Sequence, residues 1–178
     1  MLFAGNSLAI RQLDQFAAFN ENLTSLFANR GASGIDGNIA TAAGLIRGKN
    51  RPLTALIGDL TCLYDLNALS LLRDLPQPMT IVVLNNQGGG IFSFLPIANA
   101  NPHFEKYFAT PHGLDFKRVA ELFDVRYAQP ETPDGFRQCY MEALKSGKSS
   151  LIEVCTRRED NVVLMNSMEQ FIKKSVNK

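Results

Sequence analysis

An acidic residue and an amide residue follow two apolar runs at a spacing that could build a metal site. Asp59 comes shortly after residues 53–57, and Asn86 comes shortly after residues 80–84. Both runs are short, rich in β-branched residues and bounded by turn residues, which predicts buried parallel strands. Their carboxyl ends would share one edge of the sheet, where open α/β sheets bind ligands. The Asp59 carboxylate, the Asn86 amide oxygen and a bare Gly88 carbonyl are oxygen ligands that suit Mg²⁺ bound to a phosphate.

A simpler interpretation of this pattern stays open, in which Asp59 caps a helix and Asn86 belongs to an ordinary turn. Beyond the pattern, Gly-Asp at 58–59 and Asn-Asn at 85–86, with 27 positions from Asp59 to Asn86, resemble a known motif. It is the thiamin-diphosphate (ThDP) binding motif of ThDP-dependent enzymes. The resemblance implies that Asp59, Asn86 and the Gly88 carbonyl hold Mg²⁺, or Mn²⁺ in its place, on the diphosphate of the cofactor.

The elements that would position these residues alternate between strands and helices along the chain. Runs of apolar residues end in turn residues, and the segments between them carry apolar residues on one helical face. This alternation predicts a single domain over residues 1–178, with a doubly wound, mainly parallel sheet of about six strands and helices on both faces. The predicted strands are 1–4, 25–28, 53–57, 80–84, 125–128 and 150–156, and the predicted helices are 8–19, 37–46, 64–73, 115–123, 132–145 and, as a helix or tail, 160–178.

Local signals predict how some of these helices begin and which face they bury. Ser7 and Asp36 each precede a helical pattern and are predicted N-caps. The connection 87–113 is long for a compact domain, which is typical of functional loops. The inward residues are predicted to be Phe116, Val119, Ala120 and Phe123 in one helix and Phe136, Tyr140, Met141 and Leu144 in the next.

A second resemblance is more specific and covers the chain up to about residue 156. The segment Asn-Arg-Gly-Ala-Ser-Gly-Ile-Asp-Gly at 29–37, with the segments 5–7, 64–69 and 89–93, is similar to one family. It is the C-terminal domain of the 2-succinyl-5-enolpyruvyl-6-hydroxy-3-cyclohexene-1-carboxylate synthases, the ThDP- and Mg²⁺-dependent transferases of menaquinone biosynthesis. The resemblance implies decarboxylation of 2-oxoglutarate and addition of the succinyl unit to isochorismate, in a cytoplasmic homo-oligomer.

The resemblance also implies roles for single residues. Ser7, Arg11 and Arg30 would lie at the substrates, which are polycarboxylates and suit guanidinium groups. For Ser7 and Arg11, a capping serine and a solvated helix arginine are open alternatives. Ile35 would hold ThDP in its bent form, which brings its reacting atoms together, and core packing is the alternative there. The implied cofactor-binding residues are Ile35, Gly58, Asp59, Leu60, Asn86, Gly88, Gly90, Ile91 and Phe92, with Leu60 at a position where the motif often has glycine.

No residue of this chain matches the glutamate that activates the cofactor in this superfamily. The resemblance implies that this glutamate lies on a pyrimidine-binding domain, normally of another subunit. This chain is therefore expected to be the diphosphate-binding part of a longer enzyme, with no catalytic residue and no turnover alone. Two other functions stay open. One is a ThDP decarboxylase or carboligase of acetolactate synthase type, against which Arg30 argues. The other is a non-catalytic domain that binds a metal-diphosphate ligand or assembles with a partner.

Composition excludes several classes of function. A net charge of +1 over 178 residues gives no electrostatic reason to expect a nucleic-acid or membrane-surface partner. No run approaches the roughly 18 apolar residues of a membrane span. Cys62, Cys139 and Cys155 are far apart without metal-ligand spacing, which indicates thiols in a reducing compartment. The segment 147–149 resembles the end of a phosphate-binding P-loop but lacks its earlier glycine.

Overall fold

The computed structural model describes residues 1–18, 25–99 and 102–176 of the chain. The chain forms two compact units. The first comprises Met1–Asn85 and Leu114–Cys155 and contains the sheet, and the second comprises Asn86–Gly113 and Thr156–Lys178. In the ranges described, no helix combines the length and the apolar character needed to cross a membrane.

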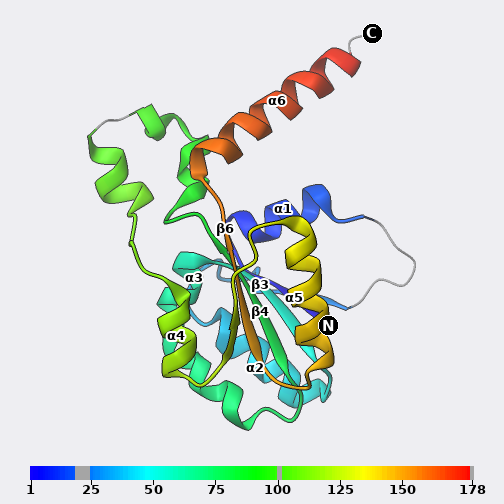
Figure 1. Ribbon diagram of the computed structural model, residues 1–178. Coiled ribbons are helices and arrows are strands. Elements are labelled where there is room, and N and C mark those ends of the chain that lie inside the picture. The colour runs from blue at the N-terminus through cyan, green and yellow to red at the C-terminus, as the bar shows by residue number, and fades with distance from the viewer. Residues whose placement is uncertain (19–24, 100–101, 177–178) are drawn as a thin grey trace. The chain divides into compact units, whose positions relative to one another are not determined.

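Six strands form one sheet in the first unit (Figure 1). Their spatial order is β2-β1-β3-β4-β6-β5, and every neighbouring pair is parallel. The strands are β1 (Leu2–Ala4), β2 (Leu26–Ala28), β3 (Leu53–Gly58), β4 (Met79–Asn85), β5 (Arg126–Ala128) and β6 (Ser150–Cys155). The predicted parallel α/β sheet is confirmed, and each predicted strand end lies within about two residues of the observed one.

The helices of the first unit cover both faces of the sheet. Right-handed crossovers place helices on opposite faces when the chain moves in opposite directions across a parallel sheet. Accordingly, α1 (Leu8–Phe16) and α5 (Pro133–Lys145) cover one face. On the other face lie α2 (Asn38–Lys49), the 3₁₀ helix η1 (Leu66–Asp74) and α4 (Phe116–Leu122). The end of the helix predicted over 8–19 falls partly outside the described residues.

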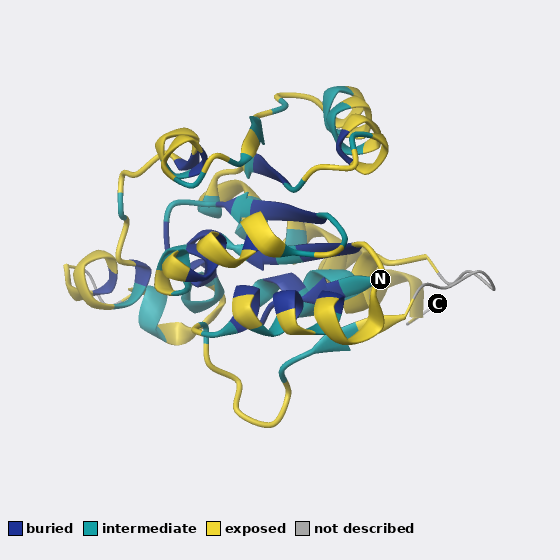
Figure 2. Ribbon diagram, turned by 90° about the horizontal axis from the view of Figure 1, so that it is seen from below, coloured by how far each residue is buried: buried dark blue, intermediate teal, exposed yellow. Residues whose placement is uncertain are grey.

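The core is built around β3 and β4, because both of these central strands are covered on their two faces. Figure 2 shows most of the central sheet coloured as buried, while the helices alternate between buried and exposed sides. The edge strands β2 and β5 have no buried residue. The inward residues predicted for α4 are confirmed, with Phe116 and Ala120 fully buried. For α5 the prediction is partly wrong, because Met141 and Leu144 are each 46% exposed. The largest fully buried core side chains include Phe3, Phe116, Ile39, Ile46, Ile57, Leu69, Met79, Ile81, Leu151 and Ile152.

Three predictions about helix starts are wrong. The Ser7 side chain makes no capping hydrogen bond to α1, and Gly37 rather than Asp36 precedes α2, with φ of 70°. The helix predicted from residue 64 starts earlier, as α3 (Asp59–Tyr64), and is then broken at Asp65 before η1. Asp65 Oδ2 instead accepts hydrogen bonds from the backbone N–H groups of Ile39 at 2.6 Å and Ala40 at 3.0 Å. A carboxylate distant in sequence therefore caps α2.

The second unit contains the long connection and the C-terminal helix. The connection folds into three short helical turns, η2 (Gly90–Phe94), η3 (Pro96–Asn99) and η4 (Glu105–Ala109), and α6 (Arg158–Val176) contacts η2. Arg158 Nη2 forms an ion pair with Glu105 Oε2 at 2.9 Å, and the Arg158 side chain is only 11% exposed. This ion pair ties the start of α6 to the connection. The predicted terminal helix is confirmed, although it starts two residues earlier.

Candidate cofactor and substrate site

Asp59 lies where β3 passes into α3. The register of the sheet pairs Gly58 with Leu84, so β3 and β4 end side by side at the carboxyl edge. Gly58 has an extended backbone and is the N-cap of α3, which makes Asp59 the first residue of the helix. The Asp59 side chain is only 2% exposed, and its Oδ1 accepts a hydrogen bond from Leu60 N at 2.7 Å. A buried carboxylate at a strand end suits a cation, as the sequence predicts.

Asn86 begins the second unit, directly after the last residue of β4. Its Oδ1 atom is buried and has no hydrogen-bond partner among the described residues. Leaving such an atom unsatisfied costs about 1–3 kcal/mol, and a bound cation would satisfy it. The donor set expected from the sequence is one carboxylate, one amide oxygen and one carbonyl. In the described ranges, no cluster of three or more His, Cys, Asp or Glu side chains could hold a metal ion.

Neighbouring backbone atoms leave no room for a side chain at Gly88 and Gly89, the two positions after Gln87. Gly88 has a φ of 133°, and a Cβ there would collide with the backbone oxygen of Ala109. A Cβ on Gly89 would collide with the backbone oxygen of Phe108, and Gly89 N donates to Ala109 O at 2.6 Å. These contacts hold the Gly88 backbone in a conformation that other residues rarely adopt.

The residues predicted beyond these glycines belong to η2 in the second unit. Gly90 is buried, whereas Ile91 and Phe92 are half-buried. The Phe92 ring packs edge-on against Phe108, with ring centroids 5.8 Å apart. Their apolar surfaces are thus partly accessible to a ligand. In the first unit, Ile35 is likewise half-buried in the turn before α2.

Two arginines predicted to bind substrate line one cavity. The cavity has a volume of about 460 Å³ and lies between α1 and the edge strand β2. Arg11 Nη1 donates to Ser7 O at 2.7 Å, and Arg30 Nη1 donates to Asn6 Oδ1 at 2.8 Å. The lining residues are Ile10, Arg11, Leu13, Asp14, Ala17, Ala18, Leu26 and Arg30. The two cations outnumber the single carboxylate of Asp14 in this otherwise apolar lining, and this net positive charge suits a carboxylate ligand.

Ser7 is not among the lining residues of that cavity, but its backbone is strained. Its φ of 69° and ψ of −129° are sparsely populated for a residue with a side chain. Such outliers cost about 1–3 kcal/mol and concentrate at functional sites. The neighbouring Asn6 is 2% exposed, and its Nδ2 donates to Gly34 O at 2.7 Å. Asn6 therefore links Arg30 to the turn that carries Ile35, a connection that the sequence analysis missed.

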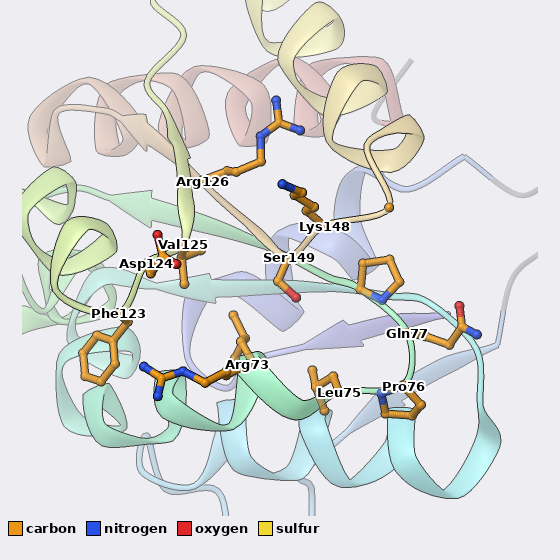
Figure 3. A pocket seen from close by; sticks show the side chains of 13 residues that line it. Arg73, Leu75, Pro76, Gln77, Phe123, Asp124, Val125, Arg126, Lys148 and Ser149 are labelled. Atoms are coloured by element: carbon orange, nitrogen blue, oxygen red, sulfur yellow. The ribbon is translucent and has the colours of Figure 1, made fainter.

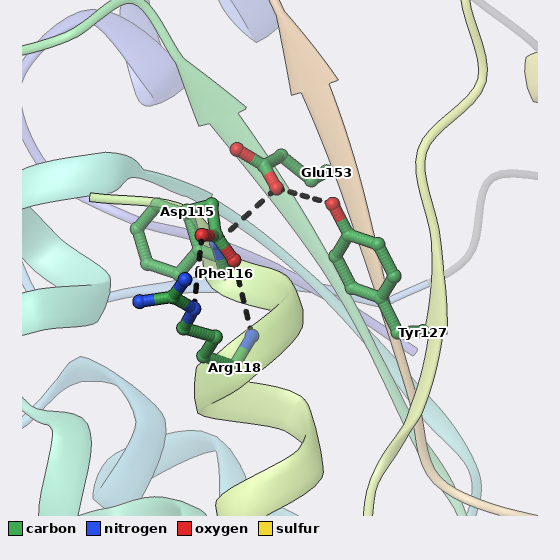
Figure 4. A network of polar contacts seen from close by, with 5 residues as sticks. All are labelled: Asp115, Phe116, Arg118, Tyr127 and Glu153. Carbon is green, nitrogen blue, oxygen red and sulfur yellow. Dashed lines mark hydrogen bonds and ion pairs between the residues drawn. The ribbon is translucent and has the colours of Figure 1, made fainter. Parts of the chain in front are cut away.

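A buried polar network around Glu153 was also missed. Glu153, on β6, is 1% exposed and accepts a hydrogen bond from Asn85 Nδ2. It also accepts from the Tyr127 hydroxyl and from Phe116 N (Figure 4). Burial, followed by the hydrogen bond to Glu153, raises the pKa of the Tyr127 phenol well above its usual value. A charged residue inside the apolar run Leu-Ile-Glu-Val was the available signal, because carboxylates are rarely fully buried without partners.

A second pocket lies at the opposite, amino edge of the sheet (Figure 3). It has a volume of about 340 Å³ and is lined by the connections that lead into β4, β5 and β6. Arg73, Arg126 and Lys148 contribute three cations against the single carboxylate of Asp124. None of the predicted cofactor, metal or substrate residues lines this pocket. It is therefore separate from the strand ends that carry the predicted site.

ThDP-binding domains have a parallel α/β sheet of this kind. It carries a buried aspartate after one central strand and an asparagine pair at the end of the next. The family model described as thiamine pyrophosphate enzyme, C-terminal TPP binding domain, matches residues 8–154, and the chain belongs to this family. The fold agrees with solved structures of benzoylformate decarboxylase from Polynucleobacter necessarius and 4-hydroxybenzoylformate decarboxylase from Rhodococcus jostii. The first has a TM-score of 0.70 at 21% identity and covers 88% of this chain and 30% of that one. The second has a TM-score of 0.62 at 27% identity and covers 75% of this chain and 25% of that one.

Among curated proteins, similar relatives carry the name 2-succinyl-5-enolpyruvyl-6-hydroxy-3-cyclohexene-1-carboxylate synthase. The relative from Salinibacter ruber is 47% identical over 175 residues, which is 98% of this chain and 29% of the relative. The relative from Chlorobium luteolum is 51% identical over 162 residues, which is 90% of this chain and 28% of the relative. The chain thus spans less than a third of the length of these relatives.

Proposed function

We propose that this chain is the diphosphate- and metal-binding domain of a ThDP-dependent 2-succinyl-5-enolpyruvyl-6-hydroxy-3-cyclohexene-1-carboxylate synthase. The observation that carries the proposal is the identity of 45–51% to relatives of that name over at least 90% of the chain. The substrates would be 2-oxoglutarate and isochorismate. The enzyme would act in the cytoplasm on the way to menaquinone, as a homo-oligomer.

The cofactor half of the site would be held at the carboxyl ends of β3 and β4. Asp59, Asn86 and the Gly88 carbonyl would bind Mg²⁺, and the buried, unpaired Asn86 Oδ1 supports that role. Bound ThDP would supply the nucleophilic carbon for decarboxylation of the 2-oxoacid. Gly58, Leu60 and Gly90 would approach the cofactor through their backbones. Ile35, Ile91 and Phe92 would provide apolar walls that exclude water.

The substrate half would use the arginines at the cavity beside α1. Arg11 and Arg30 would each bind a carboxylate, because a guanidinium offers a planar pair of donors to a carboxylate. Ser7 O fixes Arg11 and Asn6 Oδ1 fixes Arg30, so both guanidinium groups are oriented before a ligand arrives. This orientation reduces the conformational entropy that the side chains lose when a ligand binds. The activating glutamate would come from a pyrimidine-binding domain of a partner subunit, so this chain alone would have no turnover.

The test is a substrate-specific assay of the full-length protein. We expect ThDP, Mg²⁺, 2-oxoglutarate and isochorismate together to give carbon dioxide and the succinylated product, detected by mass spectrometry. Pyruvate in place of both substrates is the control for the acetolactate synthase alternative. Turnover of pyruvate to acetolactate, without loss of isochorismate in the first mixture, would overturn the proposal.

A further inference from the structure

Glu153 is a charged residue in the middle of the sheet. Its Oε1 accepts from Asn85 Nδ2 at 2.6 Å and from Cys155 Sγ at 3.6 Å. Its Oε2 accepts from the Tyr127 hydroxyl at 2.6 Å and from Phe116 N at 3.3 Å. Figure 4 shows the Oε2 side of this arrangement, with Tyr127 from β5 and the first turn of α4 converging on the carboxylate. One carboxylate therefore joins β4, β5, β6 and α4.

All four of these partners donate to Glu153, so both carboxylate oxygens act as acceptors. No Lys or Arg ion pair to Glu153 is found in the described residues. Burial of an anion without a nearby cation is unfavourable. A polar network that serves only packing would be replaceable by apolar side chains at little cost. A cation bound nearby would offset the cost of burying a negative charge on Glu153.

The thiol of Cys62, on α3, is affected by the same carboxylate. This thiol is fully buried, and burial is the main cause that raises its pKa to about 12. The negative charges of Asp65, Asp59 and Glu153 raise it further. Three carboxylates, two at the ends of α3 and one on β6, thus act on the same buried atom. These carboxylates make the surroundings of Cys62 electronegative.

We propose that Glu153 is a positioning residue for the metal-binding turn, an inference that rests on the proposed ThDP function. Glu153 holds Asn85 by a charge-assisted hydrogen bond, and Asn85 directly precedes Asn86, whose Oδ1 is buried and unpaired in the described structure. This hydrogen bond restrains the backbone at the end of β4 and hence the position of the next residue, Asn86. The carboxylate also adds negative charge that attracts Mg²⁺. Glu153 itself need not touch the metal.

The two oxygens of Glu153 allow a matched control. Asn85 bonds to Oε1, whereas Tyr127 bonds to Oε2, and both distances are 2.6 Å. Tyr127→Phe removes a hydrogen bond of the same length from the same carboxylate but leaves Asn85 in place. Asn85→Ala removes the link to the metal turn. Glu153→Gln removes the negative charge and leaves one acceptor oxygen for the donors of Asn85 and Tyr127, so it weakens the same link. A purely structural network would respond to all three changes through stability alone.

The experiment measures ThDP binding to the full-length protein by calorimetry over a range of Mg²⁺ concentrations, with no substrate turnover. The thermal midpoint of each variant is measured separately without ligand. Outer-shell changes around metals typically cost about 10–100-fold in metal affinity. We therefore expect Glu153→Gln and Asn85→Ala to raise the half-saturating Mg²⁺ concentration at least about tenfold, with effects that do not add in the double variant. Tyr127→Phe should lower the thermal midpoint without such a shift.

The inference is overturned if Glu153→Gln and Tyr127→Phe change the Mg²⁺ requirement equally, because the network would then be structural only. If Glu153→Gln does not fold, Asn85→Ala decides in the same way. Wild-type protein that binds ThDP without any need for Mg²⁺ would instead overturn the proposed metal site. These two failures are distinguished by the wild-type titration alone.

Discussion

Replacing Arg30 by alanine should impair the use of substrate and leave ThDP binding intact. The guanidinium has five N–H donors, and the structure commits Nη1 to Asn6 Oδ1 at 2.8 Å. Arg30 is exposed and lines the 460 Å³ cavity, so its remaining donors are accessible to a carboxylate. Alanine removes this charged donor group without creating a void in the core.

The size of the effect follows from the type of bond that is lost. A hydrogen bond to a charged group contributes about 1.5–3 kcal/mol, which corresponds to a decrease of about 10–150-fold in kcat/KM. Arg30→Lys keeps the charge but loses the planar pair of donors, so it should recover only part of the activity. Steady-state kinetics of the full-length protein with each substrate varied would give these values.

A matched control is Arg126→Ala, which removes another exposed arginine of the same unit at the amino edge of the sheet. It should leave kcat/KM unchanged. ThDP affinity of Arg30→Ala, measured by calorimetry in the presence of Mg²⁺, should match the wild type. A loss of ThDP affinity as large as the loss in kcat/KM would refute a substrate role and assign Arg30 to the cofactor.

Two further predictions concern stability. Gly88→Ala should lower the thermal midpoint by several degrees, because strain at its positive φ costs about 1–3 kcal/mol and the new Cβ would meet Ala109 O. Gly48→Ala is its control, since a Cβ there meets nothing within 4 Å, and an equal loss in both variants would contradict the argument. Burial raises the pKa of the Cys62 thiol from its ordinary value of 9.0 to about 12 in the folded chain. This shift favours the folded state below pH 9, and the stabilisation is lost as the pH rises toward 12. Chemical unfolding between these pH values should therefore show a smaller loss of stability in Cys62→Ala than in the wild type, and parallel curves would show that the thiol does not contribute.

The sequence predicted the sheet well because its signals were local. The runs at 53–57 and 80–84 are continuous and β-branched, as strands covered on both faces must be. Turn residues marked where each strand ends, so the placement of Asp59 at a strand end was predictable. Thr132 and Pro133 likewise marked the start of α5, where Thr132 accepts a capping bond from Gly135 N at 3.1 Å.

Features that depend on distant residues were not predictable in this way. Asp65 caps α2 across an interval of 26 residues, so no local motif identified it, and the nearer Asp36 was a reasonable but wrong choice. Met141 and Leu144 follow the helical period of α5, yet they lie beyond the strip that the sheet covers. The cavity that joins Arg11 and Arg30 depends on how α1 packs beside β2, which periodicity does not encode.

The contacts of Glu153, a charged residue in the core, also depend on distant residues. Glu153 is a carboxylate in an apolar strand, but the sequence analysis did not identify its role because its partners Asn85 and Tyr127 are 68 and 26 residues away in the chain. Only the pairing of β6 with β4 and β5 brings them together. The metal role of Asn86 was predicted from the motif alone, and the orphaned Oδ1 atom is the physical observation that supports it.

The most direct test of the central claim is calorimetry of ThDP binding to the full-length protein with and without Mg²⁺, for the wild type and Asp59→Ala. Asp124→Ala serves as the control, since it removes an exposed carboxylate at the opposite edge of the sheet. We predict Mg²⁺-dependent binding in the wild type and in Asp124→Ala, and none in Asp59→Ala. Undiminished Mg²⁺-dependent binding in Asp59→Ala would contradict the assignment of the metal and cofactor site to the carboxyl ends of β3 and β4.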